Sequence, residues 1–216
     1  MGENFQRNME PLFQNFGGER RTLLLHSCCA PCSSYVLEAL TPYFDITVDY
    51  YNPNIDTAAE YEHRAQEQRR FAAEACLASP VRVHVEPYSP EEFYAAVKGL
   101  EHIPEGGERC FACYRLRLEQ AARLCRDGGY DYFCTTLSIS PHKNAAKLNE
   151  IGAAMARKYG VAWLPSDFKK KNGFKRSTQL SAEHHMYRQD YCGCVFSKKE
   201  RRQAQETPPT DASSQS

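Results

Sequence analysis

Five short runs of aliphatic, β-branched or aromatic residues alternate along the chain with segments of helical periodicity, and this alternation limits the fold more than any other feature. The runs are predicted strands at residues 22–27, 44–51, 81–85, 130–137 and 161–165. Strands that alternate with helices pair in parallel through right-handed crossovers. We therefore expect an α/β fold, a parallel-sheet α/β/α sandwich, with any site at the carboxyl ends of the strands.

Segments of helical periodicity separate the predicted strands. They cover residues 33–40, 57–77, 90–97 and 110–125, and a further helix follows Pro141. The 216 residues fit one domain with a full hydrophobic core. Polar composition at both ends predicts a flexible N-terminal extension at residues 1–20, a single α/β domain over 21–202 and a disordered C-terminal tail over 203–216.

The charge balance gives no indication of a nucleic-acid partner, because the chain has 27 basic and 27 acidic residues. The basic residues are densest at 169–176 and 198–202, where a solvated surface and a phosphate contact both stay open as interpretations. No apolar run is long enough to span a membrane, and the first residues lack the apolar segment of a secretory signal. We therefore expect a soluble, cytoplasmic protein without a membrane partner.

Seven of the ten cysteines fall into three short groups, and this grouping is the main chemical signal in the sequence. The groups are Cys28 with Cys29 and Cys32, Cys110 with Cys113, and Cys192 with Cys194. The first occupies the predicted turn between the first strand and its helix, and the second opens a predicted helix, where both thiols lie on one side of the first turn. The third flanks a single glycine, which permits a disulfide or joint metal ligation.

Grouped cysteines in a reducing compartment more often bind metal or carry out redox chemistry than form structural disulfides. A structural zinc site needs only four thiolates and would leave three grouped cysteines without a role. A metal cluster with a separate dithiol accounts for six, so we favour redox chemistry, and structural zinc stays open. Cys76, Cys125 and Cys134 lie in apolar or helical segments, where we expect buried structural thiols.

Several ordered motifs give the chain its resemblance to the QueH family of epoxyqueuosine reductases. The motifs are LLLHSCCAPCS at 23–33, YYNPNI at 50–55, EYEHR at 60–64, ERCFACYRLRL at 108–118, TTLSISPHKN at 135–144 and FKRSTQLSAEHHMYRQDYCGC at 174–194. They span about residues 22–200 and include every cysteine group. The resemblance implies a fold related to the adenine nucleotide alpha-hydrolase (PP-loop, HUP-like) group, with 21–202 as the catalytic domain.

The resemblance also implies a reaction: two-electron reduction of epoxyqueuosine at the tRNA wobble position to queuosine, the last step of that modification, with the epoxide oxygen lost as water. The implied partners are this tRNA and an electron donor that the sequence does not identify. CCAPCS stands where ATP-using relatives of the fold carry a Gly- and Ser-rich phosphate loop, so ATP is not expected. Cobalamin belongs to a different family with the same activity and is not implied either.

By the same resemblance, the expected ligands of a [4Fe–4S] cluster are Cys28, Cys29, Cys110 and Cys113, and the expected redox-active pair is Cys192 with Cys194. Cys32 is close enough in sequence to ligate an iron or a second, mononuclear metal beside the cluster. A dithiol stores the two electrons and two protons that epoxide removal requires. The alternative is a cluster on three thiolates with one iron open as a Lewis acid.

Six residues are candidates for substrate contacts, each with an ordinary structural alternative. They are Asn52, Asn54, His142, Lys143, Lys175 and Arg176. The histidine and lysine of the loop after the fourth strand could protonate the leaving oxygen or hold phosphate, or lie in a solvated loop. The asparagines suit base edges or ribose but are also common in turns. The last two basic residues suit phosphate.

Overall fold

The computed structural model describes residues 5–206, in which five parallel strands form one sheet in the order β3-β2-β1-β4-β5. The strands are β1 (Arg21–His26), β2 (Phe44–Tyr50), β3 (Arg82–Val85), β4 (Tyr132–Thr135) and β5 (Ala162–Trp163). Every predicted strand is present, and the parallel α/β class is confirmed. The predicted fourth strand is longer than β4, because its last residues turn into the 3-10 helix η1 (Thr136–Ile139).

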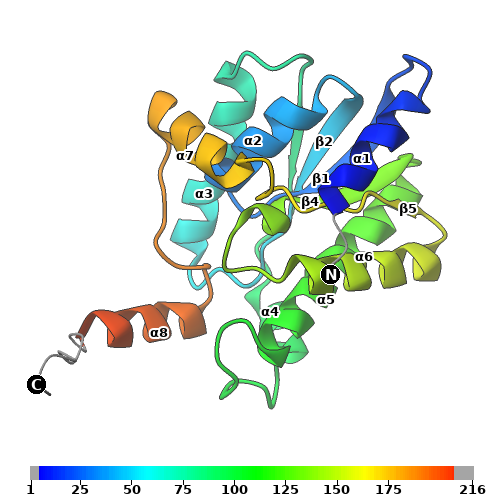
Figure 1. Cartoon of the computed structure of the whole chain (residues 1–216). Helices are drawn as coiled ribbons and strands as arrows, with labels where there is room; N and C mark the ends of the chain where they lie inside the picture. The colour runs from blue at the N-terminus through cyan, green and yellow to red at the C-terminus, as the bar shows by residue number, and fades with distance from the viewer. Residues whose placement is uncertain (1–4, 207–216) are drawn as a thin grey trace, which may run out of the picture.

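Helices cover both faces of this sheet (Figure 1). One layer contains α2 (Ala30–Leu40), α3 (Ala58–Glu74) and α7 (Gly173–Glu183), in which α2 contacts both of the others. The other layer contains α5 (Glu108–Asp127), which packs on β1 and β4, and α6 (Ala145–Tyr159). The short α4 (Pro90–Ala96) contacts α5, and α8 (Val195–Glu206) extends away from the body of the molecule.

Local sequence explains where several helices begin. Pro31 lies in the first turn of α2, where its missing N–H costs nothing. The Thr57 hydroxyl accepts the Glu60 N–H at 3.2 Å and caps α3, and the Asn144 side chain accepts the Lys147 N–H at 3.0 Å and caps α6. None of the described helices is both long and apolar enough to cross a membrane.

The N-terminal segment that the sequence predicted to be a loose extension contributes to the core over its described part. It forms α1 (Phe5–Gln14), Met9 is buried, and the Phe16 ring meets the edge of the Phe44 ring with centroids 5.4 Å apart. At the other end, α8 continues to Glu206, into the predicted tail. The rest of both predicted end segments, residues 1–4 and 207–216, lies outside the described residues.

The strand order creates a switch point between β1, the central strand, and its neighbour β4. The connections that follow β1 and β2 run through the α2 and α3 layer, whereas the connection that follows β4 runs through α6 on the opposite layer. Loops therefore diverge at the carboxyl ends of these two strands and leave a crevice, which is where ligands bind in open α/β sheets. The CCxxC turn follows β1 and η1 follows β4, so both border this crevice.

Candidate active site

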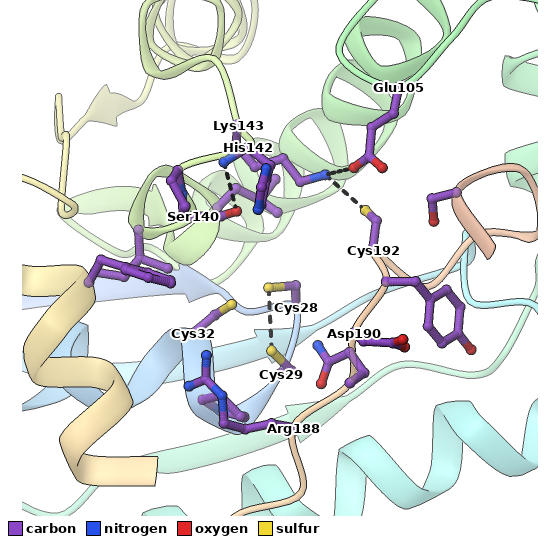
Figure 2. A pocket seen from close by; sticks show the side chains of 18 of the residues that line it. Cys28, Cys29, Cys32, Glu105, Ser140, His142, Lys143, Arg188, Asp190 and Cys192 are labelled. Carbon is purple, nitrogen blue, oxygen red and sulfur yellow. Dashed lines mark hydrogen bonds and ion pairs between the residues drawn. The ribbon is translucent and has the colours of Figure 1, made fainter. Parts of the chain in front are cut away.

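A pocket of about 500 Å³ lies at the switch point. Cysteines from two of the three groups line it, together with the basic loop after η1: Cys28, Cys29, Cys32, His142, Lys143 and Cys192. Figure 2 shows the Cys28–Cys32 turn on one side of the cavity and Cys192 with Lys143 on another. The volume is in the range of sites for small molecules. The pocket thus brings together thiols and a cation that are far apart in sequence.

The CCxxC turn forms a compact group of three sulfur ligands. The Sγ atoms of Cys28, Cys29 and Cys32 all lie within 4.8 Å of one another, and no other group of three or more Cys, His, Asp or Glu side chains meets this spacing in residues 5–206. Cys28 Sγ also lies 3.8 Å from the Thr136 hydroxyl of η1. Thiolates are the ligands that zinc and iron–sulfur clusters prefer, so this donor set fits such a centre.

Negative charge in this group concentrates on Cys29. The thiols of Cys28 and Cys32 donate hydrogen bonds to its sulfur and hold the pKa of Cys29 well below its ordinary value, with a further contribution from the Arg64 guanidinium. Hydrogen bonds of the Cys32 thiol with Cys28 and with Cys29, together with burial, raise the pKa of Cys32 well above its usual range. Arg64 is buried and pairs with Glu60 at 2.7 Å, so its position is fixed. The turn is therefore prepared to present a thiolate.

A buried ammonium group faces Cys192 across the pocket. Lys143 is only 8% exposed, and its Nζ donates hydrogen bonds to Glu105 Oε1 at 2.9 Å and to Cys192 Sγ at 3.0 Å. Burial opposes the charge, but the negative potential of Cys192, Tyr114 and Glu105 raises the pKa of Lys143 well above its ordinary value. Lys143 is consequently protonated and lies in direct contact with the thiol.

The loop after β2 holds the Cys-Gly-Cys segment in place. Gly193 has a φ of +121°, and a Cβ there would lie 3.2 Å from Arg64 Nη1, so glycine meets both requirements. Its carbonyl accepts the Asp56 N–H at 2.9 Å. The Asp56 carboxylate in turn accepts from the Tyr191 hydroxyl at 2.9 Å and from Lys198 Nζ at 2.6 Å. These contacts anchor the segment on both sides of Gly193.

Cys110 and Cys113 lie on the first turn of α5, but the structure does not bring them into the group around Cys28. Cys113 shares an apolar cluster with Cys194, and its Sγ lies 3.9 Å from the Nη1 donor of Arg117. Burial raises the pKa of Cys113 to about 12. The group of closely spaced sulfurs thus contains Cys32 in addition to Cys28 and Cys29, and ligation of a cluster by Cys110 and Cys113 stays a prediction.

Arg117 connects the floor of the site to the sheet. It is 1% exposed and donates to His26 Nε2 at 3.1 Å and to Asn52 Oδ1 at 2.5 Å. The Asn52 amide donates in turn to the Ser27 carbonyl at 2.8 Å, so both ends of this side chain have protein partners. Burial and the Arg117 charge lower the pKa of His26 to about 3, which leaves the imidazole neutral. Neither Asn52 nor the buried Asn54 lines the pocket.

The other predicted contact residues divide between the pocket and the outer surface. His142 is exposed and lines the pocket. Lys175 is exposed outside it, and Arg176 pairs with Glu38 at 2.7 Å and with Glu183 at 3.0 Å.

The three ungrouped cysteines also divide. Cys125 and Cys134 are buried, as predicted, because they lie on the inner side of α5 and in β4. Cys76 is exposed, so the prediction of a buried thiol there is wrong: α3 ends at Glu74, and Cys76 lies beyond the helix, between Ala75 and Leu77, which pack against the core.

Sequence reasoning missed several residues of the pocket. Glu105, Phe174, Arg188 and Asp190 all line it. The last three lie within the motif at 174–194 that ends in the Cys-Gly-Cys segment, and their place in this motif was the only sequence signal that could have identified them. Glu105 lies in a polar loop without a motif of its own and reaches the site only through tertiary packing.

Comparisons with known proteins identify the family of the chain. The family model described as epoxyqueuosine reductase QueH matches residues 23–200. Proteins named epoxyqueuosine reductase QueH are similar to the chain in Streptococcus pyogenes (42% identity, covering 91% of this chain and 78% of the relative), Staphylococcus epidermidis (46%, covering 83% and 77%) and Thermotoga maritima (39%, covering 84% and 93%). The matched range includes all three cysteine groups and every residue named above as lining the pocket. The chain therefore belongs to the QueH family of epoxyqueuosine reductases.

Proposed function

We propose that this chain reduces epoxyqueuosine in the anticodon loop of tRNA to queuosine, with Cys192 and Cys194 as the dithiol that supplies electrons. The observation that carries this proposal is the contact between the buried Lys143 ammonium and Cys192 Sγ inside a pocket that the CCxxC turn also lines. A thiol beside a fixed cation is poised for redox chemistry, and the name of the relatives supplies the substrate. The proposed catalytic domain covers residues 21–202.

The step balances with two thiols. Both C–O bonds of the epoxide break, and a carbon–carbon double bond forms between the two ring carbons. The thiols give up two electrons and two protons as the disulfide between Cys192 and Cys194 forms, and the oxygen leaves as water. An electron donor, a reductase or small redox protein, then returns two electrons and two protons to the disulfide.

Lys143 is the proposed proton donor to the leaving oxygen. It is protonated, its Nζ lies at hydrogen-bond distance from the reacting thiol, and it lines the cavity. A buried ammonium also stabilises negative charge that develops on the oxygen as the C–O bonds break. Glu105 contacts the same Nζ at 2.9 Å and keeps it directed toward Cys192. His142, exposed at the rim, is the proposed contact to substrate.

The Cys28, Cys29 and Cys32 thiols are the proposed holders of a metal centre. Their mutual spacing and the lowered pKa of Cys29 support this assignment, and Cys110 with Cys113 stay as the alternative ligands that the family resemblance implied. A [4Fe–4S] cluster bound there would supply electrons one at a time. The buried charges of Arg64 and Arg117 lie close to these thiols and offset the negative charge of metal-bound thiolates.

The proposal includes the setting in which the enzyme works. The substrate is tRNA, so the proposed site of action is the cytoplasm, and the electron donor has to reach the same pocket. Neither ATP nor cobalamin appears in the proposed step.

One set of experiments tests the proposal. Protein purified without oxygen is incubated with tRNA that carries epoxyqueuosine and with dithionite, and nucleosides are counted by mass spectrometry. Wild type is expected to form queuosine, Cys192→Ser and Cys194→Ser to lose the activity, and Cys76→Ser, which alters an exposed thiol outside the pocket, to retain it. A protein that holds one zinc and no sulfide, and leaves epoxyqueuosine unchanged, would instead indicate a structural zinc module.

A further inference from the structure

We propose that Phe174 is the surface on which the target base stacks and that Arg188 binds a phosphate next to that base. Helix α7 and the segment after it would then form the nucleotide-binding wall of the pocket, facing the thiols. This inference rests on the proposed function, because the base is that of the tRNA nucleotide to be reduced.

Phe174 is an exposed aromatic side chain that pairs with no other aromatic ring among the described residues. It is 40% exposed and lines the pocket, and its ring contacts no other aromatic ring among residues 5–206. The two other large exposed apolar side chains differ from it in this respect. Tyr43 stacks on Phe13 at 4.3 Å, and Tyr94 lies against Phe93 at 5.5 Å. Phe174 therefore offers a free apolar face to whatever enters the cavity.

The first turn of α7 holds Phe174 on a rigid support. A Cβ at Gly173 would lie 1.9 Å from the Phe168 carbonyl oxygen and 2.5 Å from the Tyr35 ring, so the backbone here is pressed directly against α2. Helix α2 is the helix that begins at the CCxxC turn. The backbone that carries Phe174 is thus positioned relative to the CCxxC turn by close packing of two helices rather than by a flexible loop.

A nucleobase is the ligand that fits such a face. Proteins recognise single-stranded loops of RNA by stacking their unstacked bases on aromatic side chains. The cavity of about 500 Å³ is large enough for one nucleoside. Cys192 and Lys143 line the same cavity, so a base stacked on Phe174 would lie in the pocket that also holds the reacting groups.

Arg188 supplies the complementary charge for the RNA backbone. It lines the pocket and is exposed, and Figure 2 shows its guanidinium on the side of Cys29 and Cys32. Nη1 donates to the Ser181 hydroxyl at 2.9 Å, which ties the side chain to α7, and no carboxylate of the described residues pairs with it. The remaining guanidinium donors are available to phosphate oxygens, which arginine binds through two hydrogen bonds.

Binding measurements test the two roles separately. The probe is a fluorescently labelled anticodon stem-loop carrying epoxyqueuosine, titrated at several salt concentrations, and the free epoxyqueuosine nucleoside is titrated in parallel. Stacking contributes about 1–3 kcal/mol per base, so Phe174→Ala is expected to weaken binding of both ligands by about 5- to 150-fold. Phe174→Trp keeps an aromatic ring and is expected to bind about as well as wild type. Tyr94→Ala removes an exposed aromatic ring outside the pocket and is also expected to bind as wild type does.

Arg188→Gln is expected to weaken binding of the stem-loop but not of the free nucleoside. It also lowers the slope of log affinity against log salt by about 0.7 for each phosphate of a single strand that the protein no longer neutralises. Arg69→Gln, on the exposed face of α3, is the control. Melting temperatures measured without ligand show whether each variant is folded. Phe174→Leu keeps an apolar side chain without the ring, so it separates loss of stacking from loss of apolar volume.

The outcomes are distinct. If the wild type binds the stem-loop and Phe174→Ala binds it equally well, the stacking role is refuted and the proposed function stands. An unchanged salt slope in Arg188→Gln refutes the phosphate interaction alone. If the wild type binds neither ligand, the proposed function fails and this inference fails with it.

Discussion

Asp49 gives a prediction whose magnitude follows directly from the structure. It lies on β2 in register with His26 of β1, it is fully buried, and neither of its carboxylate oxygens has a hydrogen-bond partner among the described residues. Burial and repulsion from Glu86 raise its pKa to about 8, although the Arg117 charge opposes the shift. At neutral pH the folded protein therefore keeps this carboxyl group protonated beneath the site.

The sign of the effect follows from proton binding. In the unfolded chain Asp49 releases its proton above its ordinary pKa of 3.8, whereas the folded protein holds it up to about pH 8. The folded state binds one more proton between these values, so stability decreases as the pH rises through this window and levels off above it. Because of this residue the unfolding equilibrium constant should rise about tenfold per pH unit. The free energy of unfolding should accordingly fall by roughly 4 kcal/mol between pH 5 and pH 8.

Urea denaturation of wild type and Asp49→Asn at pH 5, 6, 7 and 8 checks this reasoning. Asn does not titrate, so the difference in unfolding free energy between the two proteins is expected to shift in favour of Asp49→Asn with each pH unit. Asp45→Asn alters an exposed aspartate of the same strand and is expected to follow the wild-type pH dependence. A difference between wild type and Asp49→Asn that stays constant over these four pH values would refute the buried, protonated carboxyl group.

Three further predictions concern the site. Cys32→Ala is expected to lose most of the iron and acid-labile sulfide of anaerobically purified protein, whereas Cys76→Ala retains both; equal metal content would remove Cys32 from the ligand set. Lys143→Gln removes the proton donor, so turnover should fall by about 10²- to 10⁴-fold in single-turnover assays with epoxyqueuosine tRNA, and a rate near that of wild type would exclude this role. Gly173→Ala places a methyl group 1.9 Å from the Phe168 carbonyl and is expected to destabilise the protein by about 1–3 kcal/mol; an unchanged urea midpoint would show that α7 shifts freely.

Much of the fold was predictable because its pattern is local. Residues 23–25 of β1 form a continuous apolar run and β2 is buried along most of its length, and buried strands between amphipathic helices specify a parallel sheet covered on both faces. The strand-to-helix turn after β1 places the CCxxC motif at the carboxyl edge of the sheet without further information. The contribution of the N-terminal segment to the core escaped prediction because the segment is mostly polar, and because it depends on long-range packing, such as that of Phe16, just after α1, against Phe44 of β2.

The site was predictable in its elements but not in their pairing. Lys143 was identified from its loop, yet its partners Glu105 and Cys192 come from other elements, and no spacing in the sequence indicates such contacts. Asn52 was expected to face the substrate, but Arg117 from α5 takes its carbonyl oxygen instead. Phe174 lies within the basic run at 169–176, and the sequence analysis interpreted that run by its charge and not by its one aromatic residue. Long-range packing decided each of these outcomes.

The contacts of Asp56 with the Cys-Gly-Cys segment should make the loop after β2 and residues 191–198 evolve together. One carboxylate serves Tyr191 and Lys198, and the backbone beside it serves Gly193, so a substitution at any of these places removes a partner from the others. Variation among relatives should therefore be correlated: where position 56 loses its acid, positions 191 and 198 should change in step. If every single substitution is made and its effect on activity is measured, the effects at Asp56 should resemble those at positions 191–198 more than those at the nearby residues of α3.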